Sequence, residues 1–431
     1  MATPMLIAQL LNLLYNIVDR IYIGKIPGEG TLALASMCFP FVTLITAFAN
    51  LFGLGGAPLC AMARGKGNRE GAQGIMVNAG FMLLLSGAVL TVLGIAFHRP
   101  LLYLFGASEV TYPYASSYIV IYLIGTLCVM LSLGLNPYIN CQGFARTGML
   151  TVALGAAANI VLDPIFIFAL HLGVRGAAIA TVLSQLLSAA WVVKFLTGKK
   201  AELKLDFRGF RPDWHCIQRI TVLGIASFVM SFTDTLVQVA CNATLRNFGG
   251  DLYISVMTVL NSVRQIAQTP VLAIADGAST AISYNYGARL YRRTRDAIRF
   301  MTQIAIGYTM LVWMLVSLFP ALFIRIFNQD AELVAAAVPA LHIYFFGFVM
   351  MAFQYSGQST FRALGRAKYA VFFSLLRKAF IVVPLTLLLP YCWNLGVSGV
   401  FAAEPVSNCI GGLACYFTMR HVVMPELKME N

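Results

Sequence analysis

Two aspartates lie within long apolar runs of the sequence, where a charged side chain is costly. Asp19 lies near the end of the first run and Asp163 near the end of the fifth. Ionisable groups inside a bilayer-spanning segment usually have a function. At 1.5 Å of rise per residue both lie about 7–11 Å from the same surface, so their side chains can meet. Two carboxylates that interact in a low dielectric titrate as a coupled pair, and we expect this pair to take up and release protons near neutral pH.

Neutral polar residues share the helix faces of these aspartates. Asn12 precedes Asp19 by seven residues, and Asn159 precedes Asp163 by four. Both spacings place the two side chains on one face of a helix. We therefore expect the two asparagines to line the same cavity as the two acids.

A third polar stripe lies in the sixth apolar run, where Thr181 and Gln185 are four residues apart. Thr181 is expected at a depth similar to that of the two aspartates. The structural alternative is that the first aspartate pairs with Arg20, the second caps a kink at Pro164, and the neutral polar groups join helices. Adjacent residues point about 100° apart on a helix, so Arg20 is poorly placed for that pairing.

Charged residues in the second half of the chain occur with both signs. Asp234 and Arg264 are expected at similar depths, and Glu404 at a depth similar to that of Arg377 or Lys378. Buried charges are usually paired. We expect structural ion pairs here, with a direct role in ion or substrate binding as the alternative.

The composition indicates the elements that must position these groups. Hydrophobic residues make up 59% of the 431 residues and charged residues 11%, and the mean hydropathy is +0.78. Runs of about 20 apolar residues cross a bilayer, and the backbone in lipid must bond internally, so the spans are helices. The sequence predicts an all-α integral membrane protein with twelve spans. They cover residues 3–24, 31–57, 73–97, 113–136, 149–170, 174–193, 220–245, 252–284, 300–319, 336–361, 369–391 and 396–419.

The distribution of Lys and Arg predicts the orientation of the spans. Twenty-one of the thirty lie on one set of alternate loops and the C-terminal tail, and five on the opposite loops. This bias predicts that both termini are cytoplasmic. It also accounts for the net charge of +13, so we expect no nucleic-acid partner. No basic segment or cleavage site precedes the first span at Pro4, so no cleavable signal is expected, and whether native N-terminal residues are missing stays open.

The sequence also repeats itself at a nearly constant offset. Residues 172–176 return with one change as residues 395–399, and Gly143 and Gly365 lie 222 positions apart. Such matches predict two six-helix bundles related by a pseudo-two-fold axis along the membrane normal, since an even number of spans keeps both halves facing the same way. We expect an N-lobe at residues 1–196, a cytoplasmic linker at 197–216, and a C-lobe at 217–431 with a short cytoplasmic tail.

Common catalytic signatures are not visible in the sequence. The nine cysteines are scattered and form no C-x-x-C, the five histidines form no cluster with Cys, Asp or Glu, and HExxH, GxSxG and P-loop motifs do not occur. We therefore expect no enzyme activity, no metal and no cofactor besides a coupling ion, H⁺ or Na⁺. Duplicated apolar halves without a nucleotide site are typical of secondary transporters.

Four segments carry a resemblance to a known family: Pro4 with residues 14–24, residues 159–167, residues 172–178 and residues 361–368. They resemble the first, fifth and sixth helices of the multidrug and toxic compound extrusion (MATE) family and the loop after its tenth helix. The likeness is greatest to the DinF-like and MepA-like bacterial branch and covers essentially the whole chain. The resemblance implies that Asp19 and Asp163 couple transport to a cation. Pro4 lies in the same helix as Asp19, where a proline permits bending.

The same resemblance implies a polar cavity in the N-lobe. The positions that match its lining are Tyr118, Asn136, Asn159, Thr181 and Gln185, with Asn136 expected near the inner end of its span. Asp234 matches an acid of the sodium-coupled branch, but residues 336–361 hold no Asp or Glu where that branch has a second one. This departure favours protons over sodium, which remains the alternative coupling ion.

These features together predict a secondary antiporter of the bacterial inner membrane, which we expect to be monomeric. It would export organic, cationic amphiphilic compounds in exchange for protons by alternating access. The alternative within the same superfamily is a flippase for a lipid or a lipid-linked sugar, which would need a cationic groove open to lipid. An intramembrane enzyme is the alternative from another class, and no motif favours it.

Overall fold

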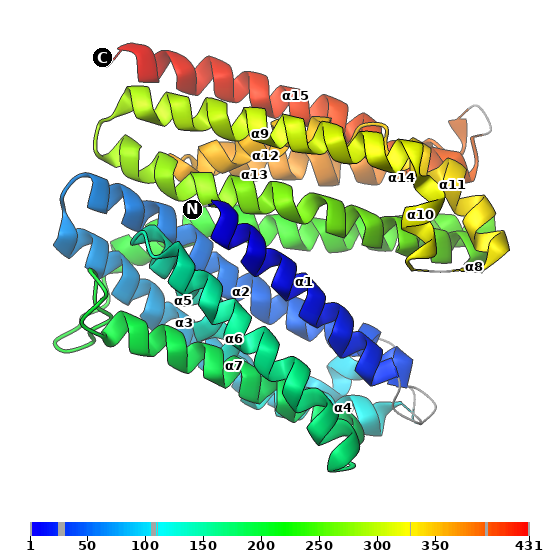
Figure 1. The fold of residues 1–431 in the computed structure, drawn as a ribbon, viewed down its shortest axis with the longest axis horizontal. Helices are drawn as coiled ribbons and strands as arrows, with labels where there is room; N and C mark the ends of the chain where they lie inside the picture. Colours follow the sequence, from blue (N-terminus) through cyan, green and yellow to red (C-terminus); the bar gives the residue numbers. More distant parts are fainter. Residues whose placement is uncertain are drawn as a thin grey trace. The chain divides into compact units, whose positions relative to one another are not determined.

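The computed structural model describes residues 2–24, 31–104, 109, 111–327, 329–392 and 395–429, and within these ranges its regular elements are helices (Figure 1). The chain divides into two compact units, Thr3–Phe228 and Val229–Asn431. The helices of the first unit are α1 (Ala2–Gly24), α2 (Thr31–Gly65), α3 (Arg69–Leu104), α4 (Tyr112–Ile124), α5 (Thr126–Cys141), α6 (Ala145–Pro164), the π-helix η1 (Ile165–Ala169) and α7 (Gly173–Thr197). Helix α8 (Trp214–Gly287) begins in this unit and continues into the second.

The second unit continues from α8, which is interrupted at Gly250, where the backbone leaves the helical conformation (φ 64°). Its further helices are α9 (Tyr291–Leu318), α10 (Pro320–Arg325), α11 (Ala331–Phe345), α12 (Met350–Ala363), α13 (Ala367–Leu375), the π-helix η2 (Leu376–Val382), α14 (Val383–Leu388) and α15 (Val397–Met429).

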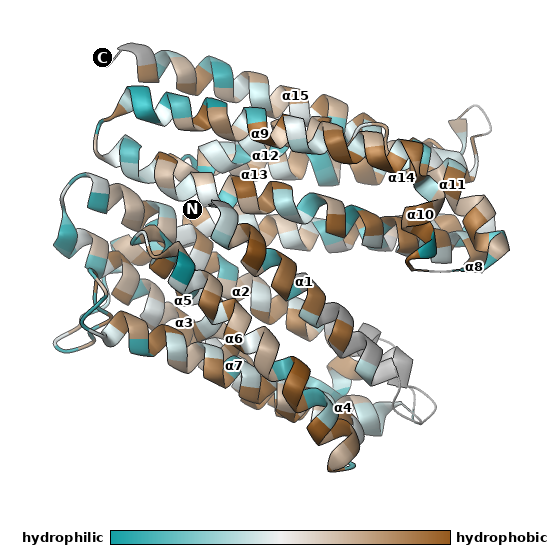
Figure 2. Cartoon of the chain, in the orientation of Figure 1, coloured by the Kyte–Doolittle hydropathy of each residue, from teal (hydrophilic) through white to brown (hydrophobic). Residues whose placement is uncertain are grey.

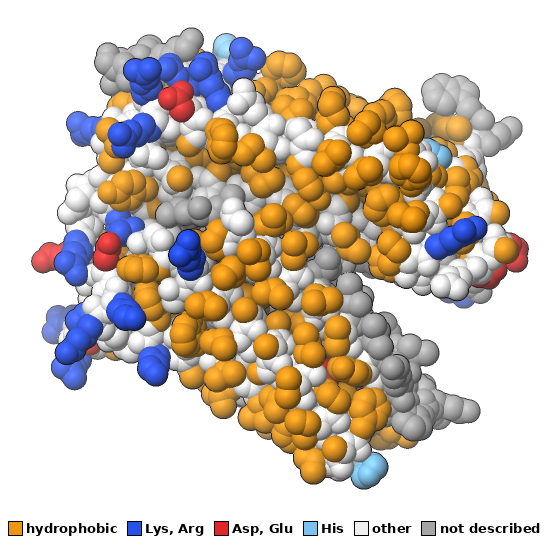
Figure 3. Space-filling model, viewed as in Figure 1, with side chains coloured by type: hydrophobic (Ala, Val, Ile, Leu, Met, Phe, Trp, Pro, Cys, Tyr) orange, Lys and Arg blue, Asp and Glu red, His pale blue; other side chains and the backbone are white. Residues whose placement is uncertain are grey.

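The helices follow the apolar runs of the sequence. Within the described residues, seven helices are long and apolar enough to cross a membrane, or nine when two bent pairs each count as one span. Helix α1, the part of α8 after Gly250 and α15 occupy the three other predicted spans, which completes the twelve-helix fold. Figure 2 shows hydrophobic residues along the middle of most helices and hydrophilic ones at the α2–α3 loop and the first turns of α9. In each unit, most Lys and Arg on the visible face gather at one end of the helices (Figure 3).

The backbone confirms the repeat that the sequence predicts. Gly143 and Gly365 are both left-handed, with φ of 92° and 73°, and so are Gly173 and Gly396, with φ of 54° and 52°. The fourth and tenth spans are both bent pairs: α4 and α5 meet at 54°, and α11 and α12 at 50°. Two halves with the same bends at equivalent positions are copies of one unit.

The polar segment between the sixth and seventh spans is held against the first unit. Ala201, Leu203 and Leu205 are buried while the residues between them are exposed, which is the alternation of an extended strand-like segment. The Leu203 amide donates to Gln142 Oε1 at 2.9 Å, and the Glu202 carboxylate contacts Arg64. The segment is therefore an ordered part of this unit.

Candidate functional site

The aspartate of the fifth span lies where its helix changes type. Helix α6 ends at Pro164 and continues as η1, in which Leu170 donates to the Ile165 carbonyl five residues earlier. A proline has no N–H to donate to the preceding turn, so the helix widens there. Asp163, next to this proline, is fully buried, and its Oδ1 accepts a hydrogen bond from Asn159 Nδ2 at 3.2 Å. The four-residue spacing therefore unites these two side chains, as predicted.

Helix α7 brings Thr181 to the level of this pair. A Cβ at Gly155 would lie 2.3 Å from Ser188 Oγ, and one at Gly176 would lie 2.5 Å from the Phe166 carbonyl oxygen. These two approaches fix an antiparallel register in which Thr181 lies beside the turn of α6 that holds Asp163. Two buried atoms here, Asn159 Oδ1 and Thr181 Oγ1, have no hydrogen-bond partner among the described residues. Unpaired buried polar atoms are uncommon and indicate a place for a ligand, an ion or water.

Helix α1 supplies the neighbouring wall. Tyr22 makes an edge-to-face contact with Phe168 of η1, with ring centroids 6.2 Å apart. This contact puts the C-terminal turns of α1, which include the backbone of Asp19, next to the π-helix. The side chain of Asp19 lies outside the described residues, so its meeting with Asp163 stays a prediction. Asn12 is half-buried in the middle of α1, and Pro4 lies in its first turn.

Two further residues that were predicted to line the cavity lie on α7 and α4. Gln185 lies one turn from Thr181 on α7, and its Oε1 accepts from Ser132 Oγ of α5 at 2.7 Å. Tyr118 is buried in α4, and its ring stacks on that of Tyr122.

Asn136, the remaining predicted cavity residue, lies beside the start of α6. Its Oδ1 would lie 3.0 Å from a Cβ on Gly148, near the start of α6. Gly148 and Asp163 are fifteen residues apart on one helix, or about 22 Å. The structure therefore places Asn136 far from the carboxyl group of Asp163. Asn136 of α5 contacts the N-terminal end of α6, whereas Asp163 lies near the C-terminal end of α6.

The charged residues of the second unit form a network around Glu404 of α15. Its Oε1 accepts from Arg264 Nη1 at 2.7 Å and from Arg377 Nη1 at 3.2 Å. Arg377 Nη1 also donates to Asn408 Oδ1 at 2.6 Å. Asn408 is one turn after Glu404 on α15, so both acceptors face the same guanidinium. The expected contact between Glu404 and Arg377 is present, and Arg264 is a second cation that the sequence did not assign to this acid.

The pairing of Asp234 differs from the expectation. We expected Arg264 as its partner, but its carboxylate contacts Lys378 Nζ. Arg377 and Lys378 are adjacent in η2 and therefore point to different neighbours, one to Glu404 and the other to Asp234. Arg264 instead bonds to Glu404, and its guanidinium lies over the ring of Tyr344, 5.6 Å from the centroid.

Both units thus carry a π-helix in the equivalent span, next to their buried charged groups. Helix η1 begins two residues after Asp163, and η2 contains Arg377 and Lys378. Single π-turns inside α-helices often occur at functional sites because they turn a side chain out of its regular position. Prolines near both segments, Pro164 and Pro384, were the only signal of them in the sequence.

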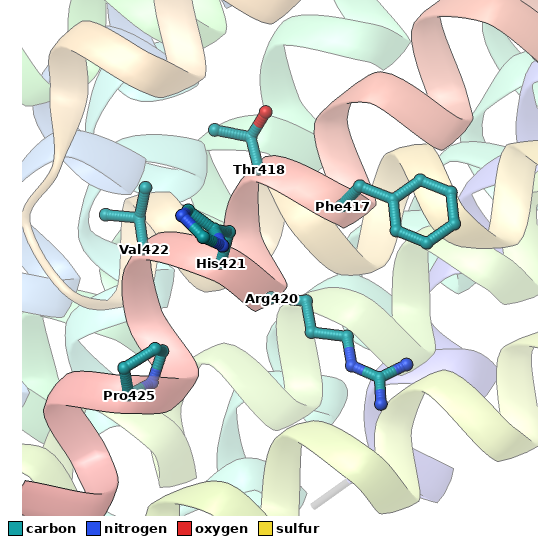
Figure 4. A pocket seen from close by; sticks show the side chains of 6 residues that line it. All are labelled: Phe417, Thr418, Arg420, His421, Val422 and Pro425. Carbon is teal, nitrogen blue, oxygen red and sulfur yellow. The ribbon is translucent and has the colours of Figure 1, made fainter.

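An open depression on α15 is not a comparable site. It is lined by Phe417, Thr418, Arg420, His421, Val422 and Pro425 (Figure 4). All six belong to one helix, and Figure 4 shows their side chains pointing in different directions from it. Among the described residues, no group of three or more His, Cys, Asp and Glu could hold a metal ion.

A known protein family matches the chain twice, once in each repeat. The sequence model of the MatE family matches residues 4–165 and again residues 226–388, so the two matches begin 222 positions apart. The chain belongs to the MatE family. Family membership and the twelve-helix fold make this MatE protein a multi-pass membrane transporter.

Relatives and solved structures match the MatE chain over nearly its full length. It is 24% identical to "Multidrug export protein MepA" of Staphylococcus haemolyticus (strain JCSC1435), covering 96% of this chain and 90% of the relative. It is also 24% identical to "FAD transporter" of Shewanella oneidensis, covering 99% and 94%. The structure described as "Crystal structure of MATE in the bent conformation" superposes with a TM-score of 0.94 at 23% identity, covering 100% of this chain and 95% of that one.

Proposed function

We propose that the protein exports organic compounds across the bacterial inner membrane in exchange for protons, with both termini in the cytoplasm and as a monomer. The observation that carries the proposal is the burial of Asp163, with no exposed surface, inside a bundle that spans the membrane. A carboxylate at such a place needs a compensating positive charge, which a proton supplies. The hydrogen bond from Asn159 to its Oδ1 comes from a neutral amide and adds no charge.

The acids of the second unit, Glu404 and Asp234, are less suited than Asp163 to couple transport to protons. Glu404 bonds to two arginines, and Asp234 contacts Lys378. Fixed cations beside a carboxylate stabilise its charged form and compete with a proton or a sodium ion. Proton exchange is therefore assigned to the first unit, to Asp163 and its predicted partner Asp19.

The name of one relative supports export as the direction of transport and organic compounds as the substrates. That relative is named a multidrug export protein, and the first unit presents acidic and amide groups, which favour cationic amphiphiles. Protonation can shift the transporter between its two open states only if the states bind protons with different affinities. One pH unit supplies about 1.4 kcal/mol per proton, enough for a roughly tenfold substrate gradient at one-to-one exchange.

Everted membrane vesicles provide the test. Addition of ethidium to an acidified vesicle should release protons in proportion to the ethidium taken up, and Asp163→Asn should abolish both movements while the protein remains inserted. Asp206→Asn, the same change at an exposed loop acid, is the matched control and should behave as wild type. Normal coupled exchange by a well-expressed Asp163→Asn protein would refute the assignment. A requirement for sodium at constant pH would replace the proton as coupling ion.

A further inference from the structure

Five charged side chains form what we term the C-terminal charge cluster: Asp234, Arg264, Arg377, Lys378 and Glu404. Glu404 contacts both arginines, Asp234 contacts Lys378, and the two groups are joined by the adjacency of Arg377 and Lys378 in η2. Three of the groups are basic and two are acidic, so the cluster carries one excess positive charge. Arg377, Lys378 and Glu404 are at most 6% exposed.

The ion pairs elsewhere in the described residues are balanced. Arg362 faces Asp276 at 3.5 Å, and Arg366 faces Glu426. Each of these pairs has one base and one acid, as expected of groups that only hold helices together. An unbalanced charge within a membrane-spanning bundle is costly, which indicates that the C-terminal charge cluster is completed by an anion.

Arg264 is the member of the cluster best placed to receive that anion. Its side chain is 16% exposed, against 5% for Arg377. Its Nη1 donates to Glu404, while Nε and Nη2 make no hydrogen bond to a described residue. A guanidinium has five N–H donors in a fixed plane, and two parallel ones match a carboxylate or a phosphate. The face of the guanidinium is held by the Tyr344 ring, so its orientation is set before a ligand arrives.

We propose that the C-terminal charge cluster binds an acidic group, a carboxylate or a phosphate, of the transported compound, with Arg264 as the direct contact. The inference rests on the proposed export function and deepens it, because it adds an acidic group to the substrate. A compound with both a basic and an acidic group would then be preferred over a simple cation. Lys378 and Arg377 act through charge, and Asp234 keeps Lys378 in place.

Equilibrium binding to the purified full-length protein in phosphatidylcholine nanodiscs tests this proposal. Riboflavin and flavin mononucleotide are fluorescent probes that differ by one phosphate. Wild type should bind the phosphate form at least tenfold more tightly. Arg264→Gln should remove this preference by weakening the binding of the phosphate form, whereas Asp234→Asn, which adds one positive charge, should strengthen it. The control Arg292→Gln, at an exposed arginine of α9, should retain the wild-type preference.

Each contrary result has a clear meaning. Equal affinity of wild type for the two probes would overturn the proposal, and so would an Arg264→Gln protein that loses both probes equally with a lowered melting temperature. A preference that vanishes when anionic phosphatidylglycerol replaces zwitterionic phosphatidylcholine would assign the site to an anionic lipid headgroup and overturn its assignment to the transported compound. Binding is measured without a proton gradient, so failure of proton-coupled export would leave this result unaffected.

Discussion

Gly67 and Arg289 lie 222 residues apart and have the same left-handed backbone, with φ of 73° and 57°. Each occupies the loop that follows the second span of its repeat. The two loops close with equivalent bonds: the Asn68 amide donates to the Ala63 carbonyl, and the Leu290 amide to the Asn285 carbonyl. The turn has been kept in both copies, but only the first has the residue that adopts it without strain.

This relationship predicts that Arg289→Gly stabilises the protein. A side chain in the left-handed region costs about 1 kcal/mol, which glycine avoids. The melting temperature of the detergent-solubilised protein should rise. Gly67→Ala should lower it by a similar amount, because a Cβ at Gly67 meets nothing within 4 Å and only the backbone preference changes. Arg289→Ala is the control and should not stabilise. If it raised the melting temperature as much as glycine does, the arginine side chain and not the backbone would be the cause.

The positions of the spans could be read from the sequence because hydropathy alone determines them. The predicted run 174–193 became α7 at Gly173–Thr197, and the run 3–24 became α1 at Ala2–Gly24. The helices extend beyond the apolar runs at the ends where Lys and Arg gather, since α3 begins at Arg69 and α9 at Tyr291. Polar residues there are in water and continue the helix without affecting the hydropathy signal.

The details of the sites could be predicted where they depend on spacing within one helix or on the matching depths of two charges, as for Glu404 and Arg377. The bond between Asn159 and Asp163 follows from their separation of four residues. The partners of Glu404 come from two other helices, and neither the π-helix that contains Arg377 and Lys378 nor the approach of Arg264 leaves a periodic signal. Asn136 lies near the start of α6, at the opposite end from Asp163, which agrees with its expected place in its span, and its role in the cavity stays a prediction.

The predicted acid pair of the first unit can be tested by a double-mutant cycle. Asp163→Asn and Asp19→Asn should each abolish proton-coupled efflux, and the double variant should be no worse than either one. Residues that act as a unit have non-additive effects. The rate of coupled ethidium efflux from proteoliposomes measures this. Independent partial losses that add in the double variant would show that the two acids do not share a proton.

Glu404 and Asp234 should differ in their effect on stability. Glu404→Gln leaves the buried Arg377 and the partly buried Arg264 without their carboxylate, which should cost about 3–5 kcal/mol and be seen as poor expression or a much lower melting temperature. Asp234→Asn should cost at most about 1 kcal/mol, because the side chain is half exposed and water replaces part of the contact. Adding Arg377→Met to Glu404→Gln should recover part of the loss. A Glu404→Gln protein that is as stable as wild type but fails to transport would show that Glu404 takes part in transport and is not only a structural ion-pair partner.

A close crossing within the first unit gives the last prediction. A Cβ on Gly224 of α8 would lie 1.8 Å from the carbonyl oxygen of Leu51 on α2, and one on Gly55 would lie 2.4 Å from that of Ile220. Both obstacles are backbone atoms, so no side-chain movement can relieve the overlap. Gly224→Ala should therefore push the helices apart and cost at least about 1–3 kcal/mol.

Gly74→Ala in α3 is the matched control for this crossing, because a Cβ there meets nothing within 4 Å. Alanine is favoured over glycine in a helix by about 1 kcal/mol, so this variant should be as stable as wild type or more so. Melting temperatures and the yield of folded protein after solubilisation measure both variants. Equal stability of Gly224→Ala and Gly74→Ala would mean that α2 and α8 do not approach to backbone contact. Helix α8 would then not pack against the first unit at Gly224, and the boundary between the two units would lie before Gly224.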